Sequence, residues 1–287
     1  MNILITGGTG FLGQHLTKAL LKEKGVAIKI LGRKKRKTRY YKFNNKKVIE
    51  SYRRDITNFD SIVGEFKDID VVFHLASNMS FLRKDWRVAY KTNVAGTRNV
   101  LQAAVQNGVK KFIHVSSIAS YGYSTKKARL NDDFVFNWKK NRANIYMRTK
   151  YLGEKAVKEM SDSIDYVIAN PVLLFGPGDP DNTYRLIDAL NKNSIPFNLP
   201  GGTSVVDVRD AANALVLLMK KKTKKTRYII AGEDVTFKEI NHRICRLLNK
   251  KPATVTLPQS ASAPLYYAAL LMELLAKNVK LASANID

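Results

Sequence analysis

Short apolar runs alternate with amphipathic stretches through the first 170 residues of the chain. Runs rich in β-branched and aliphatic residues predict strands over 2–6, 26–31, 46–51, 70–76, 110–117 and 164–170. Apolar residues at helical spacing predict helices over 11–25, 60–66, 85–107 and 144–157. Strands that are apolar throughout and separated by helices indicate a parallel sheet that is covered on both faces.

The pattern changes after residue 170. "LLFGPGDPDN" is rich in Gly, Pro and Asp and predicts a loop, and a strand-helix pair follows in "TSVVDV" and "RDAANALVLLMKK". A late strand, "RYIIA", precedes a mostly helical tail that includes the apolar stretch "APLYYAALLMELLAK". We therefore expect an α/β fold with a doubly wound parallel sheet over 1–170, to which about 204–231 returns. A smaller, mostly helical part is expected to comprise 171–203 and 232–287.

Composition narrows the class of protein. At 287 residues and 45% hydrophobic, the chain fits a globular protein with a substantial core. The single cysteine, Cys245, excludes an internal disulfide and favours a reducing compartment, so we expect the cytoplasm and a buried structural thiol. The four histidines are scattered, so no metal site is predicted. The first residues have no basic stretch followed by a long apolar run, so we expect no signal peptide, and no apolar run reaches about 18 residues.

The formal net charge of +25 is unusual. Basic residues concentrate in 31–47 and 220–227, and such blocks can attract nucleic acid or an anionic membrane surface. No helix-turn-helix, zinc-finger or RNA-binding signature accompanies them. Solvated surface charge is therefore favoured over either partner.

A glycine-rich turn joins the first predicted strand to the first helix in "ILITGGTGFLG". Its glycines match both G-x-G-x-x-G, from Gly8, and G-x-x-G-x-x-G, from Gly7. In this context glycine lets the backbone approach a pyrophosphate, and the helix amino terminus favours the negative charge. The residues expected at a bound dinucleotide are Gly7, Gly10, Phe11, Leu12 and Gly13.

The end of the second predicted strand distinguishes the two nicotinamide dinucleotides. An NAD site usually has an acidic residue there, which binds the ribose hydroxyls. This chain has Gly32 followed by Arg33, and a guanidinium can bind a 2′-phosphate. We therefore favour NADP(H) over NAD(H) as the cofactor, with Arg33, aided by Lys34 or Arg36, at the phosphate.

Eight motifs in order along the chain suggest a family. They are "TGGTGFLG" (6–13), "RDIT" (54–57), "HLAS" (74–77), "TNVAGTRNV" (92–100), "VSSIASYG" (115–122), "YMRTK" (146–150), "NPVLLFGPGD" (170–179) and "VVDVRDAANA" (205–214). The chain resembles the extended short-chain dehydrogenase/reductases, also called the NAD-dependent epimerase/dehydratase family. It is most similar to the dihydroflavonol-reductase-like and hopanoid-associated sugar epimerase-like branch.

The resemblance implies catalytic roles for four residues. Tyr146 and Lys150 match the family's YxxxK pair, and four-residue spacing places both on one helix face. A free tyrosine titrates near pH 10, and a nearby ammonium and a bound nicotinamide cation would each lower that pKa. Ser117 matches the serine that hydrogen-bonds the substrate oxygen. Asn93 matches a position that supports the active-site helix or a proton relay.

The resemblance also implies further dinucleotide contacts. Asp55 and Ile56 match the pair that contacts adenine, and Lys150 would hold the nicotinamide ribose. Leu75 and Ala76 in "HLAS" and Pro171 in "NPV" complete the implied binding residues. The first part of the chain is accordingly the expected dinucleotide-binding Rossmann domain, and the second part the substrate-binding one.

The activity has two enzymatic alternatives and one non-enzymatic one. A reductase would transfer a hydride between NADP(H) and a carbonyl or alcohol carbon, whereas an epimerase or dehydratase would act on a nucleotide sugar with NAD. The sugar enzymes commonly carry an arginine seven residues before the aspartate matching Asp210, where this chain has Thr203. Arg185 and Arg209 are possible substitutes. A dinucleotide-sensing or nucleic-acid-binding regulator is the third alternative, and the intact Ser–Tyr–Lys set argues against it.

The substrate itself is not named by the sequence. Relatives in the reductase-like branch usually continue beyond the helix matching residues 263–282, so we expect a short or truncated carboxy terminus and an open pocket. The loops "FLRKDW" and "YGYSTKKARLNDDFVFN" are expected to line it, with Phe81, Tyr123 and Phe134 as candidate residues. A small-molecule substrate and a homodimer are the partners implied by the family.

Overall fold

A computed structural model describes residues 1–33, 48–123, 134, 136–138, 144–179, 182–222, 226–258 and 260. Lys34, Arg36 and the predicted helix over 263–277 lie outside these residues. The chain divides into two compact units. The first contains Met1–Asp179 and Val205–Gly232, and the second contains Pro180–Ser204 and Glu233–Asp287.

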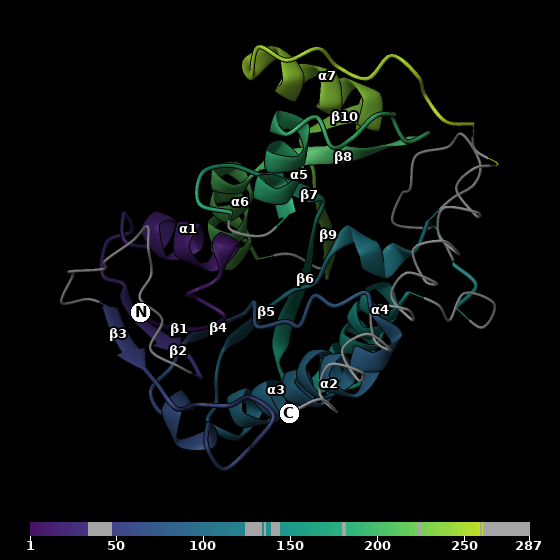
Figure 1. Ribbon diagram of the computed structural model, residues 1–287. Helices are drawn as coiled ribbons and strands as arrows, with labels where there is room; N and C mark the ends of the chain where they lie inside the picture. Colours follow the sequence, from purple (N-terminus) through teal and green to yellow (C-terminus); the bar gives the residue numbers. More distant parts are fainter. Residues whose placement is uncertain are drawn as a thin grey trace, which may run out of the picture. The chain divides into compact units, whose positions relative to one another are not determined.

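A seven-stranded parallel sheet forms the centre of the first unit, with the order β3-β2-β1-β4-β5-β6-β9 (Figure 1). Its strands, in chain order, are β1 (Asn2–Thr6), β2 (Ala27–Leu31), β3 (Val48–Ser51), β4 (Val71–His74), β5 (Lys111–Val115), β6 (Asp165–Pro171) and β9 (Arg227–Ile230). The predicted α/β fold with a doubly wound sheet is confirmed.

Helices cover both faces of this sheet. Successive strand residues point to opposite faces, so each strand contributes side chains to a core on either side. Ile3 and Ile5 belong to one core cluster, which includes residues of α1 (Phe11–Leu20) and α6 (Val208–Lys220). Leu4 belongs to the other, which includes residues of α3 (Gly96–Gln106) and α4 (Ile145–Lys158). Two separate cores explain why the strands are apolar without alternation.

The strand order determines where a site can form. β1 lies between β2 and β4. The chain runs from β1 through β2 to β3 on one side of β1 and then returns to β4 on the other side, so the strand order reverses at β1. In open parallel sheets ligands bind at the carboxyl ends of strands beside such a reversal. The glycine turn follows β1, Leu75 follows β4, Ser117 follows β5 and Pro171 ends β6, so the predicted site residues share this edge.

The structure differs from two of the predicted elements. The helix expected over 85–107 is divided into α2 (Trp86–Tyr90), a π-helical turn (Lys91–Ala95) and α3. "LLF", expected as part of a loop, forms β7 (Leu173–Phe175), which pairs in parallel with Val205–Asp207 of β8 (Gly202–Asp207). A three-residue strand is too short to give a periodic signal, and its pairing partner is distant in sequence.

The second unit contains α5 (Asn182–Asn191), β10 (Glu233–Thr236) and α7 (Phe237–Leu247). A capping box begins α7, in which Thr236 accepts a hydrogen bond from Glu239 N and Glu239 accepts one from Thr236 N. Cys245 is buried on this helix with 2% exposure, as the sequence predicted. Within the described residues, no helix is both long and apolar enough to cross a membrane.

Candidate active site

The glycine turn has the shape of a phosphate cradle. Gly7 adopts φ +73°, and a Cβ on Gly13 would lie 2.3 Å from Gly7 O, so these positions admit no side chain. Helix α1 then begins with Gly10 as its N-cap, without a side-chain cap and without an acidic residue in its first turn. Its backbone N–H groups are therefore available to an anion, and the turn fits the pyrophosphate of a dinucleotide.

Residues after β4 form the neighbouring wall. Leu75 N donates to Thr6 O at 3.0 Å, and Ala76 N donates to Thr6 Oγ1 at 3.3 Å. A Cβ on Gly7 would lie only 2.7 Å from Ala76 N, so the two segments pack backbone against backbone. The predicted residues Leu75 and Ala76 consequently lie beside the glycine turn.

The ends of β2 and β3 lie together at the far side of the turn. Arg33 is exposed two residues after the end of β2, and the backbone N of Arg54 donates to Gly32 O at 3.1 Å. Asp55 Oδ1 accepts from Thr57 N at 2.9 Å, and Ile56 is buried with its carbonyl held by Asn99. Arg33 and the Asp55–Ile56 pair are thus on adjacent strand ends.

Tyr146 and Lys150 are positioned by the start of α4. The Asn144 side chain caps this helix by accepting from Met147 N at 3.0 Å, which places Tyr146 in the first turn. Lys150 follows one turn later, is buried, and its Nζ donates to Val115 O at 2.9 Å. Ser117 hydrogen-bonds with the Tyr146 side chain. The structure therefore brings Ser117, Tyr146 and Lys150 together.

Burial has the largest effect on the pKa values of Tyr146 and Lys150. Burial raises the pKa of Tyr146, and the hydrogen bond with Ser117 opposes that rise. Burial likewise lowers the pKa of Lys150 to about 8, while the nearby Glu154 carboxylate opposes it. The lowered Tyr146 pKa expected from the sequence is therefore not produced by the residues of the chain alone, because the half-buried phenol loses hydration.

Asn93 supports α4, the helix that carries Tyr146 and Lys150. It lies in the π-helical turn, and its Nδ2 donates to Thr149 Oγ1 at 2.9 Å and to Asn78 O at 2.8 Å. Its Oδ1 accepts from Asn78 N at 2.7 Å and from Ser77 Oγ at 3.1 Å. All four hydrogen-bonding positions of the amide are thereby used, which favours the supporting role over the relay.

A directional chain of buried hydrogen bonds connects the two halves of the site. Thr97 Oγ1–H donates to Asn93 O at 2.8 Å, so Thr97 must accept from His74 Nε2–H at 2.9 Å. His74 Nδ1 is then the acceptor from Thr6 Oγ1–H at 2.7 Å, and Thr6 in turn accepts from Ala76 N. Burial and the charge of Lys150 lower the pKa of His74 to about 3, so the ring is neutral.

The chain of hydrogen bonds predicts a specific stability effect. Thr6→Val should lower the free energy of unfolding by about 1–3 kcal/mol, because it leaves His74 Nδ1 and Ala76 N without a partner. Thr17→Val is the matched control, since Thr17 is equally buried but its hydroxyl, among the residues that the structure describes, bonds only to Gly13 O within α1. Urea denaturation of both variants measures the difference. Equal losses of stability in the two variants would contradict the chain of hydrogen bonds.

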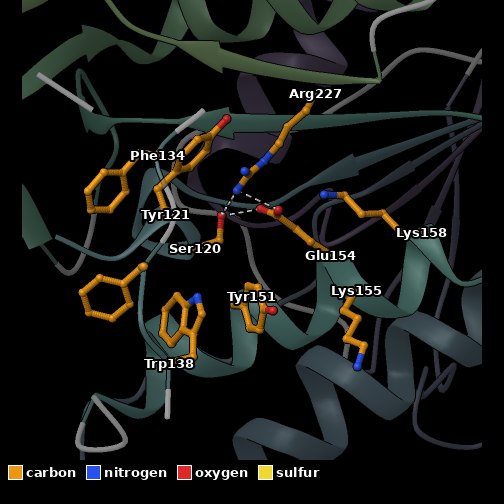
Figure 2. Close-up of a pocket in the computed structure, with 10 residues that line it drawn as sticks. Ser120, Tyr121, Phe134, Trp138, Tyr151, Glu154, Lys155, Lys158 and Arg227 are labelled. Carbon is orange, nitrogen blue, oxygen red and sulfur yellow. Dashed lines mark hydrogen bonds and ion pairs between the residues drawn. The ribbon is translucent and has the colours of Figure 1, made fainter. Parts of the chain in front are cut away.

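The three aromatic residues expected to line the substrate pocket, Phe81, Tyr123 and Phe134, lie in two different parts of the structure. Phe81 lies against Tyr146, with ring centroids 5.5 Å apart. Tyr123 and Phe134 instead contact Phe136, and Phe134 lines a pocket of about 490 Å³ together with Trp138 and Tyr151 of α4 (Figure 2). Ser117, Tyr146 and Lys150 are not among the residues that line this pocket. Phe134 therefore lines a pocket to which Ser117, Tyr146 and Lys150 do not contribute.

The glycine cradle, the Ser–Tyr–Lys group and the order of their motifs agree with one family description. A model of the NAD-dependent epimerase/dehydratase family matches residues 3–231. The chain belongs to this family. The resemblance identified from the sequence motifs is confirmed, and with it the assignment as an enzyme of the extended short-chain type.

Members of the family similar to this chain include both enzymatic alternatives. A Synechocystis sp. protein with the provisional name dihydroflavonol 4-reductase is 30% identical over 254 residues, covering 82% of this chain and 69% of that protein. The mouse sterol-4-alpha-carboxylate 3-dehydrogenase, decarboxylating, is 27% identical over 94% of this chain and 74% of its own length. Among solved structures, the UDP-glucuronic acid 4-epimerase of Bacillus cereus in complex with NAD has a TM-score of 0.76 at 26% identity, covering 90% of this chain and 86% of that one.

Proposed function

We propose that the chain is an NADP(H)-preferring oxidoreductase that acts on a carbonyl or alcohol carbon of a small organic substrate. The observation that carries the proposal is the end of β2, where an exposed Arg33 follows Gly32 and no carboxylate occupies the usual ribose-binding position. An acidic residue there would repel a 2′-phosphate, whereas a guanidinium can bind it.

Tyr146, Ser117 and Lys150 have separate roles in the proposed reaction. When bound, the dinucleotide supplies or accepts the hydride. Tyr146 donates a proton to the carbonyl oxygen in the reducing direction and accepts it in the other, with Ser117 hydrogen-bonding the same oxygen. Lys150 holds the ribose and favours the phenolate through its positive charge, as does the amino terminus of α4.

A second candidate, the nucleotide-sugar epimerase, is supported by the likeness to the Bacillus cereus enzyme. Two features weigh against it. Thr203 occupies the position where the sugar enzymes commonly carry an arginine. Arg209, a possible substitute, is engaged by Asp207, whose carboxylate accepts from Arg209 Nε at 2.9 Å and from Nη2 at 2.6 Å. The reductase is therefore the better-supported activity.

Arg33→Ala tests the cofactor preference directly. The wild type should bind NADPH more tightly than NADH. The variant should lose most of this preference, because its affinity for NADPH should fall while its affinity for NADH stays the same. Fluorescence titration with both dinucleotides measures the two dissociation constants. Arg98→Ala, which removes the same charge from an exposed residue of α3, should leave the preference intact. A wild type that prefers NADH would overturn the proposal and favour the epimerase.

A further inference from the structure

A buried ion pair lies behind the catalytic helix. Glu154 follows Lys150 by one turn of α4, is 2% exposed, and its Oε2 is 2.9 Å from Nη2 of Arg227 on β9. The Arg227 guanidinium also covers the ring of Tyr121, 3.4 Å from its centroid. Figure 2 shows Glu154, Arg227 and Ser120 joined at the polar side of the pocket. A buried pair of this kind is costly to desolvate, so its place beside the active site calls for a role beyond stability.

The same carboxylate is connected to the backbone of Ser117. Asn170 Nδ2 carries two hydrogens and lies 2.6 Å from Glu154 Oε1 and 3.0 Å from Ser117 O. Ser120 Oγ hydrogen-bonds with Glu154 Oε1 and lies 2.8 Å from Ser117 O. Asn170 thus holds both the Glu154 carboxylate and the Ser117 carbonyl, and the single hydroxyl hydrogen of Ser120 is donated to one of these two acceptors at a time. A shift of the carboxylate would be transmitted to the serine that faces Tyr146.

Glu154 also provides the negative charge near Lys150. The other titratable groups facing this ammonium are Tyr146 on its own helix, His74 on β4 and His114 on β5. Burial keeps both histidines uncharged, and burial raises the pKa of Tyr146, so all three are neutral near pH 7. Arg227 pairs with Glu154 and partly compensates the charge of its carboxylate. The sum of the charges at Lys150, Glu154 and Arg227 is therefore about one positive unit.

We propose that Glu154 is a positioning residue: its carboxylate, one turn of α4 from Lys150, offsets the positive charge there and fixes the Ser117 backbone, with Arg227 setting the strength of both effects. The inference rests on the proposed binding of a nicotinamide dinucleotide beside Lys150. Its consequence is electrostatic: Glu154 makes the site more tolerant of a positively charged nicotinamide. A role confined to packing would affect the oxidised and the reduced dinucleotide alike.

NADP⁺ and NADPH provide the test because their nicotinamide rings differ by one positive charge. Glu154→Gln keeps the shape of the side chain and removes its charge. At pH 6, where Lys150 is still protonated, it should raise the ratio of the dissociation constants, NADP⁺ over NADPH, by about three- to tenfold. Glu159→Gln is the matched control, since Glu159 caps the carboxyl end of the same helix and also pairs with an arginine, Arg98, but at the surface. An unchanged ratio in Glu154→Gln would overturn the proposal.

The pH dependence provides a second readout. In the wild type the ratio should fall as the pH rises through about 8, because Lys150 then loses its charge and NADP⁺ is less repelled. Removing Glu154 lowers the pKa of Lys150 further, so the transition should move to lower pH in Glu154→Gln. A transition at the same pH in both proteins would show that Glu154 does not control the Lys150 charge.

Glu154→Gln leaves Arg227 buried without its carboxylate and can destabilise the fold, so two further variants are needed. Arg227→Met should shift the ratio in the opposite direction, and the double variant should lie closer to the wild type. A stability cycle of Glu154→Gln with Lys150→Met, followed in urea, requires no ligand. Non-additive losses are expected, and additive ones would overturn the inference. If neither dinucleotide binds the wild type, the proposed function fails, and this cycle still decides the Glu154–Lys150 link.

Discussion

Tyr146→Phe should reduce turnover by about 10²- to 10⁴-fold while changing the affinity for the dinucleotide little. The substitution removes the hydroxyl that exchanges a proton with the substrate and leaves the ring that packs against Phe81. Lys150, which we expect at the ribose, keeps its bond to Val115 O. Ketones and aldehydes with NADPH provide the assay, and fluorescence titration provides the affinity.

The control for this prediction lies on the same helix. Tyr151 is the next tyrosine of α4 and stacks on Trp138, with ring centroids 4.8 Å apart, in the pocket that excludes the catalytic residues. Tyr151→Phe should therefore retain nearly all turnover. If Tyr146→Phe is as active as Tyr151→Phe, the assignment of the general acid and base is wrong.

Gly13→Ala should abolish dinucleotide binding and lower the free energy of unfolding by about 1–3 kcal/mol or more. The added Cβ would lie 2.3 Å from Gly7 O and 2.7 Å from Gly8 Cα. Both contacts are with backbone, so relief requires the turn itself to move. Because that turn is the proposed phosphate cradle, stability and binding should be lost together.

Gly64→Ala is the matched control, since no atom lies within 4 Å of its added Cβ and its φ is not positive. Its midpoint of urea denaturation and its affinity for NADPH should remain within experimental error of the wild type. Retention of wild-type NADPH affinity in Gly13→Ala would place the dinucleotide away from the turn.

Local features made the fold and the centre of the site predictable. Parallel strands that are buried on both faces are apolar throughout, and the glycine turn has a strand before it and a helix after it. The four-residue spacing of Tyr146 and Lys150 reports a shared helix face without any tertiary information. Ser117 could be added because its motif, "VSSIASYG", resembles the serine motif of the family.

Other parts of the site depend on contacts between distant segments. His74 lies in "HLAS" and Glu154 stands four residues after Lys150, so both were visible in the sequence, but neither position shows what it bonds. The hydrogen bonds with Thr6 and Thr97 determine which ring nitrogen of His74 carries the proton. Nothing in the spacing of Asn93 indicates the π-helical turn that aims its amide at Thr149.

The sequence by itself thus determined the family, the doubly wound sheet, the glycine turn and the Ser–Tyr–Lys group, because each depends on local spacing and order along the chain. Only the tertiary structure decided the electrostatics of that group. Burial, which no single segment determines, raises the pKa of Tyr146 against the expectation from the sequence. The pairing of Glu154 with Arg227 likewise exists only because β9 returns to the sheet beside β6 and brings the arginine to the catalytic helix.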